Sequence, residues 1–392
     1  MKLVVLGCIA LCAATVGIAV GNGDDRSAGL RTGRDARVAP RAFRVHHPRH
    51  YRVPAGAVRV STGGGLRRAL AVRRRTTIVL APGSYGGGAP FIDQFGHRIY
   101  AAHRGTAVLH AGLSIGGNEG SGGALVRGVV VDLRDARRTV EGAAIAVWGT
   151  ARHTRILDTT VRGHGVLPSG VVARRPDGLV IRRLVARGFT SYGVLVDAND
   201  LGRGRLSSRA VLADVDVAHV SRPVPRSSNG RAEACIWIGN TALIRRVRAR
   251  SCAWAGVWTG TATIGAHFDQ VAVDRTPTGV YIEHFTHDST FRRLRIGSHV
   301  EVGVTAEWDD PAWGGRPASV DNVIENSRFA SSVVGVYLDE GTTRTTVRRS
   351  TFGGQSWAAI GDYRGNGNAA YANTYRGVVG VRHDHLSTFR RP

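Results

Sequence analysis

A short β motif recurs along the chain, and this repetition limits the folds that the sequence can adopt. Residues 256–259, 279–282 and 335–338 share a pattern of glycine, valine, an aromatic residue, and then threonine or an aliphatic residue. Related tetrads begin at Gly142, Gly170, Gly193, Cys235, Gly303, Ala358 and Gly380. Most successive starts lie 21 to 24 residues apart, and insertions lengthen two of the intervals. A period of this length predicts a solenoid in which each repeat packs on its neighbours.

Each repeat contains short β runs rather than a helix. A second apolar run follows in register, because Phe268, Phe291 and Val347 each lie 12 residues after the glycine of a tetrad. This second run is plainest at residues 181–184, 244–247 and 291–294. Turn-forming glycine, asparagine, aspartate and threonine separate the runs, and the leucine ladder of a leucine-rich repeat is missing. We therefore predict an all-β fold, a single-stranded parallel β-helix of about 10 to 12 coils.

The start of the repeat region carries a resemblance to a known family. Residues 66–70 read as a short capping helix, and residues 77–85 read as the first strand and turn. Together with the repeats, this opening resembles right-handed parallel β-helix proteins of the pectin-lyase-like superfamily, over roughly residues 57–390. The resemblance implies a right-handed solenoid, and it leaves activity open, because the superfamily includes lyases, hydrolases, epimerases and adhesins.

The segment before the repeats has two parts. Residues 3–20 form an apolar run behind Lys2, and small residues near Gly21 suit signal-peptide cleavage. We expect residues 1–21 to be a signal peptide or, as the alternative, a retained membrane anchor. Residues 22–56 form a basic flexible linker, rich in Arg, His, Gly and Pro, and residues 57–392 form the β-helix domain. The protein is therefore expected to be secreted or anchored at the cell surface.

The formal charge of the chain is +24, and all of its basic residues except Lys2 are arginines. This charge suits an acidic partner such as a polysaccharide. No nucleic-acid-binding motif accompanies the charge, so we expect no specific nucleic-acid partner. We expect a monomer that meets a membrane only through an uncleaved N-terminal segment. Cys235 and Cys252 remain after cleavage, and they either pair or serve as small buried apolar residues.

Stacking would turn each repeat position into a column of side chains. When the glycine of each tetrad is position zero, positions one and three point inward, and positions two and four point outward. Position two holds Leu195, Trp237, Trp258, Tyr281, Thr305 and Tyr337. Position four holds Asp197, Gly239, Gly260, Glu283, Glu307, Asp339, Asp362 and Asp384. An aromatic column beside a carboxylate column predicts a carbohydrate groove; ordinary β-propensity and turn formation are the alternatives.

Two insertions indicate where this groove would lie. The repeat at Gly193 is 42 residues long and contains residues 222–226, and the repeat at Gly303 is 32 residues long and contains residues 309–315. Long loops on a rigid scaffold commonly carry function. We therefore expect the groove between these insertions, around Trp258.

Residues 281–288 (YIEHFTHD) loosely resemble the Asp-Pro-His-Asp segment of alginate C5-epimerases and the Ile-Asp-His segment of pectate lyases. This resemblance implies removal of a proton at C5 of a uronate, which needs a base and a group that neutralises the carboxylate. The expected catalytic residues are Glu283, His284, His287 and Glu307, with a histidine as the base. Glu283 and Glu307 are also the candidate Ca²⁺ ligands. The expected substrate-binding residues are Trp237, Trp258, Tyr281, Tyr337, Arg292, Arg295 and Asp339.

Three functions therefore stay open at this point. The first is a secreted β-helix that binds, and cleaves or epimerises, an acidic polysaccharide. The second is a non-catalytic adhesin or structural β-helix in which Asp and Asn only form turns. The third is an inverting glycoside hydrolase, which needs two carboxylates about 6.5–9.5 Å apart. The segment Gly163-His164-Gly165 resembles the Gly-His-Gly of polygalacturonases, and we interpret it as a turn.

Overall fold

The computed structural model describes residues 51, 53–86, 88–117, 121–149, 151–197, 210–220, 234–239, 242–260, 263–283, 285–306 and 319–385. The predicted signal peptide or anchor, most of the linker, the two insertions, His284 and Glu307 lie outside the described residues. No helix among the described residues has the length and hydropathy that crossing a membrane requires.

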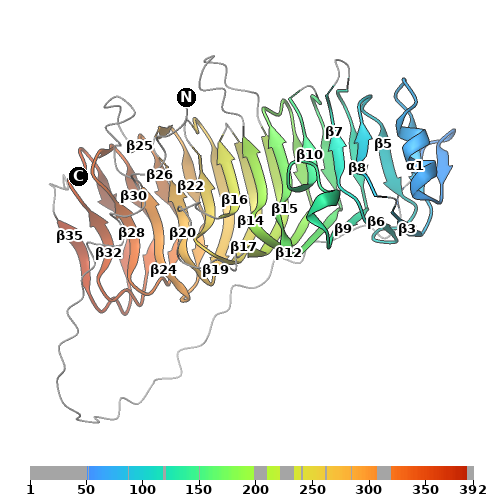
Figure 1. Ribbon diagram of the computed structural model, residues 1–392. Coiled ribbons are helices and arrows are strands. Elements are labelled where there is room, and N and C mark those ends of the chain that lie inside the picture. The colour runs from blue at the N-terminus through green and yellow to red at the C-terminus, as the bar shows by residue number, and fades with distance from the viewer. Residues whose placement is uncertain are drawn as a thin grey trace, which may run out of the picture.

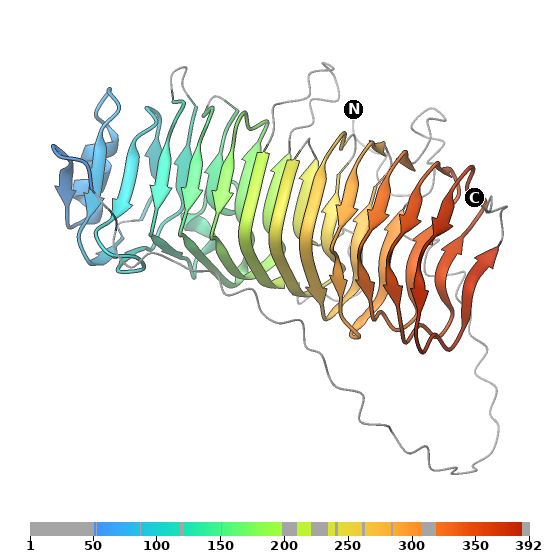
Figure 2. The same cartoon turned by 180° about the vertical axis from the view of Figure 1, so that it is seen from behind.

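The described residues form an elongated stack of β coils, with one α-helix at its N-terminal end (Figure 1; the reverse side is shown in Figure 2). All strand pairs in the sheets are parallel, and they connect 32 strands into one continuous sheet. Each coil passes in turn through three faces, which we call A, B and C, before it returns to face A one level higher. This arrangement confirms the predicted parallel β-helix.

Face A consists of β4 (Phe91–Asp93), β7 (Leu113–Ile115), β10 (Ala143–Val147), the second parts of β12 (Thr160–Arg174) and β14 (Val185–Asp197), β16 (Ala234–Gly239), β18 (Ala255–Thr259), β20 (Thr276–Ile282), β24 (Val300–Ala306), β28 (Val334–Leu338), β32 (Ala358–Asp362) and β35 (Val381–His385).

Face B consists of β1 (Val58–Val60), β2 (Thr77–Leu80), β5 (Arg98–Ala101), β8 (Leu125–Arg127), β11 (Arg155–Leu157), β13 (Val180–Arg182), the first parts of β15 (Ala210–Val220), β17 (Ala242–Cys252) and β19 (His267–Asp274), and β22 (Thr290–Arg292), β26 (Val323–Glu325), β30 (Thr346–Arg348) and β33 (Ala369–Tyr371).

Face C consists of β3 (Gly83–Tyr85), β6 (Ala107–Leu109), β9 (Val130–Asp132), the first parts of β12 and β14, the second parts of β15, β17 and β19, and β23 (Arg295–Ile296), β27 (Arg328–Phe329), β31 (Thr351–Phe352) and β34 (Thr374–Tyr375). A small three-stranded sheet of β21 (Thr286–His287), β25 (Ser319–Val320) and β29 (Thr342–Thr343) lies between faces A and B.

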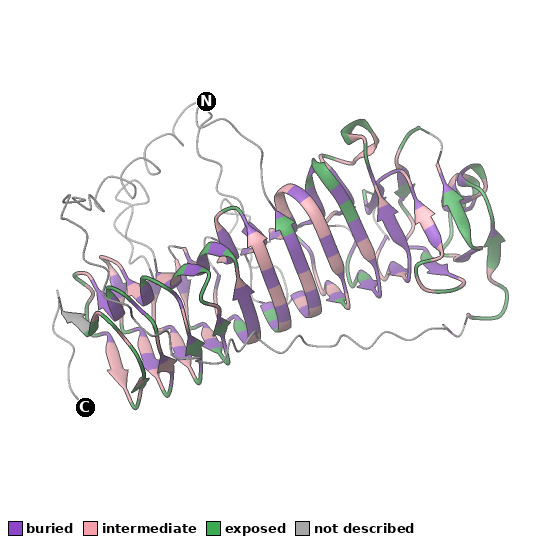
Figure 3. Cartoon of the chain, turned by 90° about the horizontal axis from the view of Figure 1, so that it is seen from below, coloured by how far each residue is buried: buried purple, intermediate pink, exposed green. Residues whose placement is uncertain are grey.

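Inward side chains fill the solenoid with stacked apolar columns. On face A, Ile236, Val257 and Val280 are aligned in successive coils and are almost fully buried. On face B, Phe268 and Phe291 stack with ring centroids 4.6 Å apart. Buried and partly exposed residues alternate along many strands, as the colouring in Figure 3 shows. The predicted inward and outward positions are therefore confirmed for these coils.

The N-terminal end of this core is covered by α1 (Gly63–Leu70). Thr62 caps the helix, because its hydroxyl accepts a hydrogen bond from the Gly65 N–H at 3.1 Å. Leu66 and Leu70 are buried against the first coils. The predicted capping helix is confirmed, and it begins three residues earlier than the sequence suggested because of this cap.

The turn between faces B and C differs from the prediction. The apolar–Arg–Arg–apolar segments were expected to be strands, but the second arginine adopts a left-handed conformation, with φ of 54° at Arg183 and 53° at Arg246. Asp158 and Asp214 occupy the same position in neighbouring coils. This conformation is unfavourable for a residue with a side chain. Ion pairs offset the cost, because Arg183 and Arg246 each bind the carboxylate one coil earlier.

Three predicted repeat starts are wrong by one or two residues, namely Gly142, Ala358 and Gly380. The residues that align with the glycines of other coils are Ala144, Ala359 and Arg382. Asp362 consequently aligns with the inward Leu338 and is 3% exposed, where it accepts hydrogen bonds from Gly365 and Asn368. Asp384 aligns with Gly361 instead of extending the carboxylate column.

Candidate functional site

The outward position-two column of face A is aromatic over three successive coils. Trp237 on β16 aligns with Trp258 on β18, which aligns with Tyr281 on β20. The Trp258 ring lies 6.4 Å from Trp237 and 5.6 Å from Tyr281 between centroids, at steep interplanar angles. All three side chains are half-buried. The column therefore forms one packed surface, as edge-to-face rings do.

Trp254 joins this surface, and the sequence reasoning did not include it. Its ring centroid lies 5.1 Å from that of Trp258 and 4.4 Å from that of Tyr281. The Trp254 carbonyl oxygen is fixed by hydrogen bonds from Thr276 and Thr278, at 3.0 and 2.9 Å. The signal for this position was available, because Trp254 precedes the glycine of its tetrad by two residues. We call Trp237, Trp254, Trp258 and Tyr281 the aromatic surface.

Glycines at position four make room for the first ring of the aromatic surface. A Cβ atom on Gly239 or Gly260 would overlap the Trp237 indole, which lies across both residues. Neither glycine has the positive φ that would explain it by backbone conformation. The two glycines therefore shape the surface instead of forming a turn.

A disulfide bond supports the same region. Cys235 on β16 is bonded to Cys252 at the end of β17, and both residues are buried. Each cysteine lies two residues before a tryptophan of the aromatic surface, Trp237 or Trp254. Of the two roles that the sequence left open, pairing is the one observed. The bond ties β16, which carries Trp237, to the end of β17, directly before the bend that carries Trp254.

Glu283 lies at one edge of the aromatic surface, directly after β20. Its backbone N–H donates to the Thr259 carbonyl and hydroxyl oxygens at 3.3 and 3.2 Å. Thr259 is fully buried, and its hydroxyl is also 3.0 Å from that of Thr286. These contacts fix the backbone at Glu283, whose side chain is half-buried. Glu307 follows the equivalent strand β24 but lies outside the described residues, so the distance between the two glutamates stays a prediction.

Asp197 and Asp339, two further carboxylates of the predicted column, have structural partners. Asp197 pairs with Arg174 of the preceding coil at 2.8 Å. The Asp339 carboxylate accepts the Glu340 N–H at 2.8 Å, which is a turn interaction. Asp339 lies one residue after β28, and Tyr337 lies on that strand beside Trp357, with ring centroids 5.9 Å apart. Tyr337 and Asp339 are thus separated from the aromatic surface by the coil that carries Thr305.

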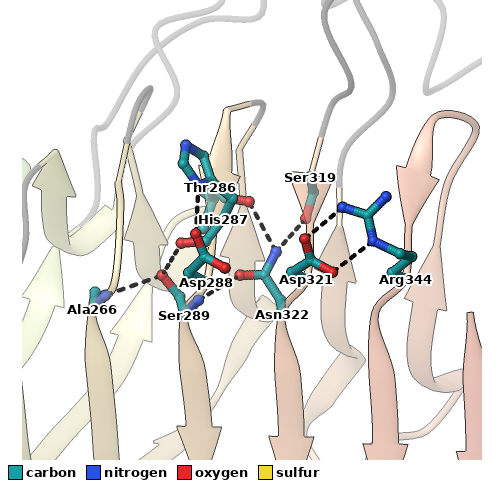
Figure 4. A network of polar contacts seen from close by, with 9 residues as sticks. All are labelled: Ala266, Thr286, His287, Asp288, Ser289, Ser319, Asp321, Asn322 and Arg344. Atoms are coloured by element: carbon teal, nitrogen blue, oxygen red, sulfur yellow. Dashed lines mark hydrogen bonds and ion pairs between the residues drawn. The ribbon is translucent and has the colours of Figure 1, made fainter.

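His287 belongs to a polar network between faces A and B (Figure 4). Its Nδ1 atom lies 3.0 Å from Asp288 Oδ2, and both side chains are exposed. One coil later, Asp321 pairs with Arg344, and the pKa of its carboxyl is lowered by the Arg344 hydrogen bond. The inner part of this network is a ladder of buried Ser289 and Asn322, with the Asn322 side-chain oxygen accepting the Ser289 N–H at 3.0 Å.

The structure does not bring the two candidate substrate arginines to the aromatic surface. Arg292 ends β22 on face B, where it and Arg293 bind Asp269, with Nε to Oδ1 distances of 3.2 and 2.6 Å. Arg295 lies on β23 of face C and aligns with Ala272 and Arg328. Arg292 lies on face B because β22 is the second strand of its coil, and the left-handed turn at Arg293 then carries the chain to Arg295 on face C.

No group of three or more His, Cys, Asp or Glu side chains that suits a metal ion occurs among the described residues. Glu283 is the one described member of the pair expected to hold Ca²⁺. The Ca²⁺ site therefore stays a prediction that requires Glu307.

Comparisons with known proteins address the fold. Neither the scan of protein-family models nor the search of curated proteins found a match. Among solved structures, the A-module of a mannuronan C-5 epimerase from Azotobacter vinelandii gives a TM-score of 0.59 at 16% identity, covering 85% of this chain and 96% of that module. PfbA, a surface adhesin of Streptococcus pneumoniae, gives 0.57 at 9% identity, covering 79% of this chain and 85% of that one.

The catalytic domain of a GH87 alpha-1,3-glucanase in complex with nigerose gives a TM-score of 0.54 at 11% identity, covering 87% of this chain and 70% of that chain. At these identities the likeness shows the fold, and it extends over most of the described coils. The three proteins differ in what their names say they do, so they share an architecture and not one activity. The chain is thus a right-handed parallel β-helix protein, with the fold that these solved structures share.

Proposed function

We propose that face A binds a polysaccharide, with the aromatic surface as the centre of the binding site. The observation that carries this proposal is the packing of Trp237, Trp254, Trp258 and Tyr281 on the outside of the solenoid. Aromatic rings that face outward lower the solubility of a protein unless a ligand covers them. Sugar rings offer flat apolar faces that suit an aromatic platform. Two of the similar proteins, the mannuronan epimerase and the alpha-1,3-glucanase, are named for polysaccharide substrates, which agrees with the proposal.

The indole of Trp258 supports its central position. Its ring contacts Trp237, Trp254 and Tyr281, and its Nε1 atom is buried with no hydrogen-bond partner among the described residues. A buried donor without a partner costs free energy. A bound hydroxyl group that reaches this N–H would recover part of that cost.

The test is a binding screen followed by one substitution. Purified protein is titrated with neutral and acidic polysaccharides, and Trp258→Ala is compared with Leu243→Ala, whose side chain is 40% exposed on face B. We expect Trp258→Ala to weaken binding at least tenfold, about 1.4 kcal/mol, and Leu243→Ala to leave it unchanged. Equal binding by both variants would rule out the aromatic surface.

We extend the proposal to catalysis at Glu283, because its half-buried side chain adjoins Tyr281 at the edge of the surface. In this proposal, proton removal from a bound uronate involves Glu283 and its predicted partners His284, His287 and Glu307. Growth of absorbance at 235 nm would indicate elimination, and new reducing ends alone would indicate hydrolysis. Binding without any product would favour the adhesin.

We also propose that the protein works outside the cytoplasm. The Cys235–Cys252 disulfide supports this, because such bonds persist mainly in oxidising compartments. Labelling of intact cells with an impermeant reagent, compared with lysed cells, tests exposure of the protein at the surface. A protein found only in the cytoplasm with both cysteines reduced would contradict the proposal.

A further inference from the structure

A second group of polar residues lies outside the aromatic surface, nearer the N-terminal end of the solenoid. A hollow of about 310 Å³ opens where face C turns into face A, and its lining residues are His110, Asp132, Arg134, Asp135 and Arg138. These residues come from two successive coils: His110 follows β6, Asp132 ends β9, and the other three follow β9. The third coil contributes His164, which contacts Asp132.

Hydrogen bonds hold both histidines in place. His110 Nδ1 lies 3.2 Å from the Asp132 carbonyl oxygen, which can only accept, so Nδ1 is the donor, and in a neutral ring Nε2 is the acceptor. His164 Nε2 lies 2.6 Å from Asp132 Oδ1. The other carboxylate oxygen of Asp132 is 3.5 Å from Arg162. Burial raises the pKa of the Asp132 carboxyl, but His164 and Arg162 outweigh this effect and lower the pKa overall.

Two guanidinium groups at the hollow are available to a ligand. No acidic side chain in the part of the chain that the structure describes pairs with Arg134. Arg138 is only loosely paired, with its Nε 3.6 Å from Asp135 Oδ2 in an exposed position, and such pairs contribute little. Asp135 is already used as the cap of the short 3-10 helix Ala136–Arg138, where it accepts the Arg137 N–H at 2.9 Å.

This combination of groups selects a class of ligand. Arg134 and Arg138 match a planar carboxylate, because a guanidinium donates two parallel hydrogen bonds to it. In its neutral form His110 accepts at Nε2, which suits a hydroxyl group. A sugar that carries both a carboxylate and hydroxyl groups satisfies both requirements, whereas an inorganic anion satisfies only the first.

The hollow lies at the turn that leads into β10, and β10 belongs to the same face as the aromatic surface. The outward position-two column continues from Ala146 on β10 through Val172 and Leu195 to Trp237. Ala146 and Val172 pack beside Trp148 in a small apolar cluster. Three coil steps of about 4.8 Å separate β10 from β16, or about 14 Å. A few sugar units of an extended chain span this distance.

We propose that the hollow at Arg134 and Arg138 is a subsite for the carboxylate of a uronate residue, and that the ligand of face A is therefore an acidic glycan. The proposal rests on the proposed function, which it extends from glycans in general to one class. It requires no catalytic activity.

The test compares two ligands on four proteins. An oligouronate and a neutral oligosaccharide of equal length are titrated by calorimetry into wild type, the double variant Arg134→Ala/Arg138→Ala, Arg137→Ala and Trp258→Ala. Arg137 is the matched control, because it lies on the same short helix and does not line the hollow. We expect the double variant to bind the oligouronate at least tenfold more weakly and the neutral glycan unchanged, while Arg137→Ala binds both as wild type does.

The outcomes separate this proposal from the proposed function. If Trp258→Ala loses the oligouronate while the double variant keeps it within twofold, face A binds glycans and the subsite is wrong. If the double variant loses the oligouronate and Trp258→Ala keeps it, the subsite is supported and the aromatic surface is not its partner. A sulfated glycan of the same length serves as a further arm, and tighter binding of that glycan than of the oligouronate would overturn the assignment to a carboxylate.

Discussion

Removal of the Cys235–Cys252 bond is the perturbation whose effect can be worked out most directly. The bond closes a short loop that contains the end of β16 and all of β17. It can be removed in two ways, by a reductant in the wild-type protein or by the double variant Cys235→Ala/Cys252→Ala. The two ways differ, because reduction leaves two buried thiols that still pack as small apolar groups.

The expected magnitude follows from the length of the loop. Cross-linking residues 17 apart in sequence restricts the unfolded chain, and for a loop of this length the restriction corresponds to about 3 kcal/mol in the chain-entropy model. The double variant also loses two buried sulfur atoms, which adds about 1 kcal/mol for each group removed. We therefore expect a smaller loss of stability on reduction than in the double variant.

The assay is urea denaturation followed by far-UV circular dichroism, with and without reductant, and the midpoints of the transitions are compared. The reductant should lower the midpoint of the wild type and leave that of the double variant unchanged. Near-UV circular dichroism should weaken in both cases, because Trp237 and Trp254 each lie two residues from a cysteine. A wild-type midpoint that is insensitive to reductant, with the thiols shown to be free, would falsify the reasoning.

Three further predictions follow from other contacts. Gly260→Ala should displace the Trp237 ring, because the added Cβ would overlap the indole; tryptophan fluorescence should change and glycan affinity should fall several-fold. Asp214→Asn should destabilise the protein by about 1 kcal/mol at pH 7, measured by urea denaturation. The Arg246 hydrogen bond lowers the pKa of the Asp214 carboxyl, so this contribution is present above the unfolded value near 3.9 and is lost as the pH falls towards the folded value. Glu283→Gln should leave the fold intact and abolish product formation on any uronate that the wild type converts.

These predictions have matched controls and clear contrary outcomes. Gly86→Ala adds a methyl group with no neighbour within 4 Å, so it should change neither fluorescence nor affinity. A Gly260→Ala variant that behaves like Gly86→Ala would contradict the packing of Trp237. An Asp214→Asn variant whose deficit persists unchanged at pH 2 would show that the lost carboxylate charge is not the cause. Activity retained by Glu283→Gln would leave Glu283 with a structural role.

The repeat period predicted the architecture well, because a β-helix repeats the same inward and outward alternation in every coil. The position-two alignment of Trp237, Trp258 and Tyr281 was readable for that reason. Trp254 was missed, because it lies outside the tetrads and reaches the same surface only through the folding of the turn before β18.

The assignment of arginines could not be made from spacing. Arg292 and Arg295 were expected at the substrate, but a strand pattern does not reveal that β22 lies on face B and that the left-handed Arg293, with φ of 54°, turns the chain onto face C before Arg295. Likewise, the coil that contains Asp362 has no glycine at the first position of its tetrad, so its register was predicted one residue too early. The Asp362 side chain, which was expected to point outward, is therefore buried. The positions of Arg292 and Asp362 are set by the pairing of their strands with neighbouring coils, which the local sequence does not reveal.

The left-handed turn between faces B and C has a consequence for how this protein can change in length. At the left-handed position of that turn, the sign of the charge alternates from one coil to the next, in the order Asp158, Arg183, Asp214 and Arg246. Deleting or duplicating a single coil there would place two arginines or two aspartates at neighbouring levels, where like charges repel. Loss or gain of two coils would preserve the alternation. Chains that share this turn should therefore differ from one another by even numbers of coils in this segment.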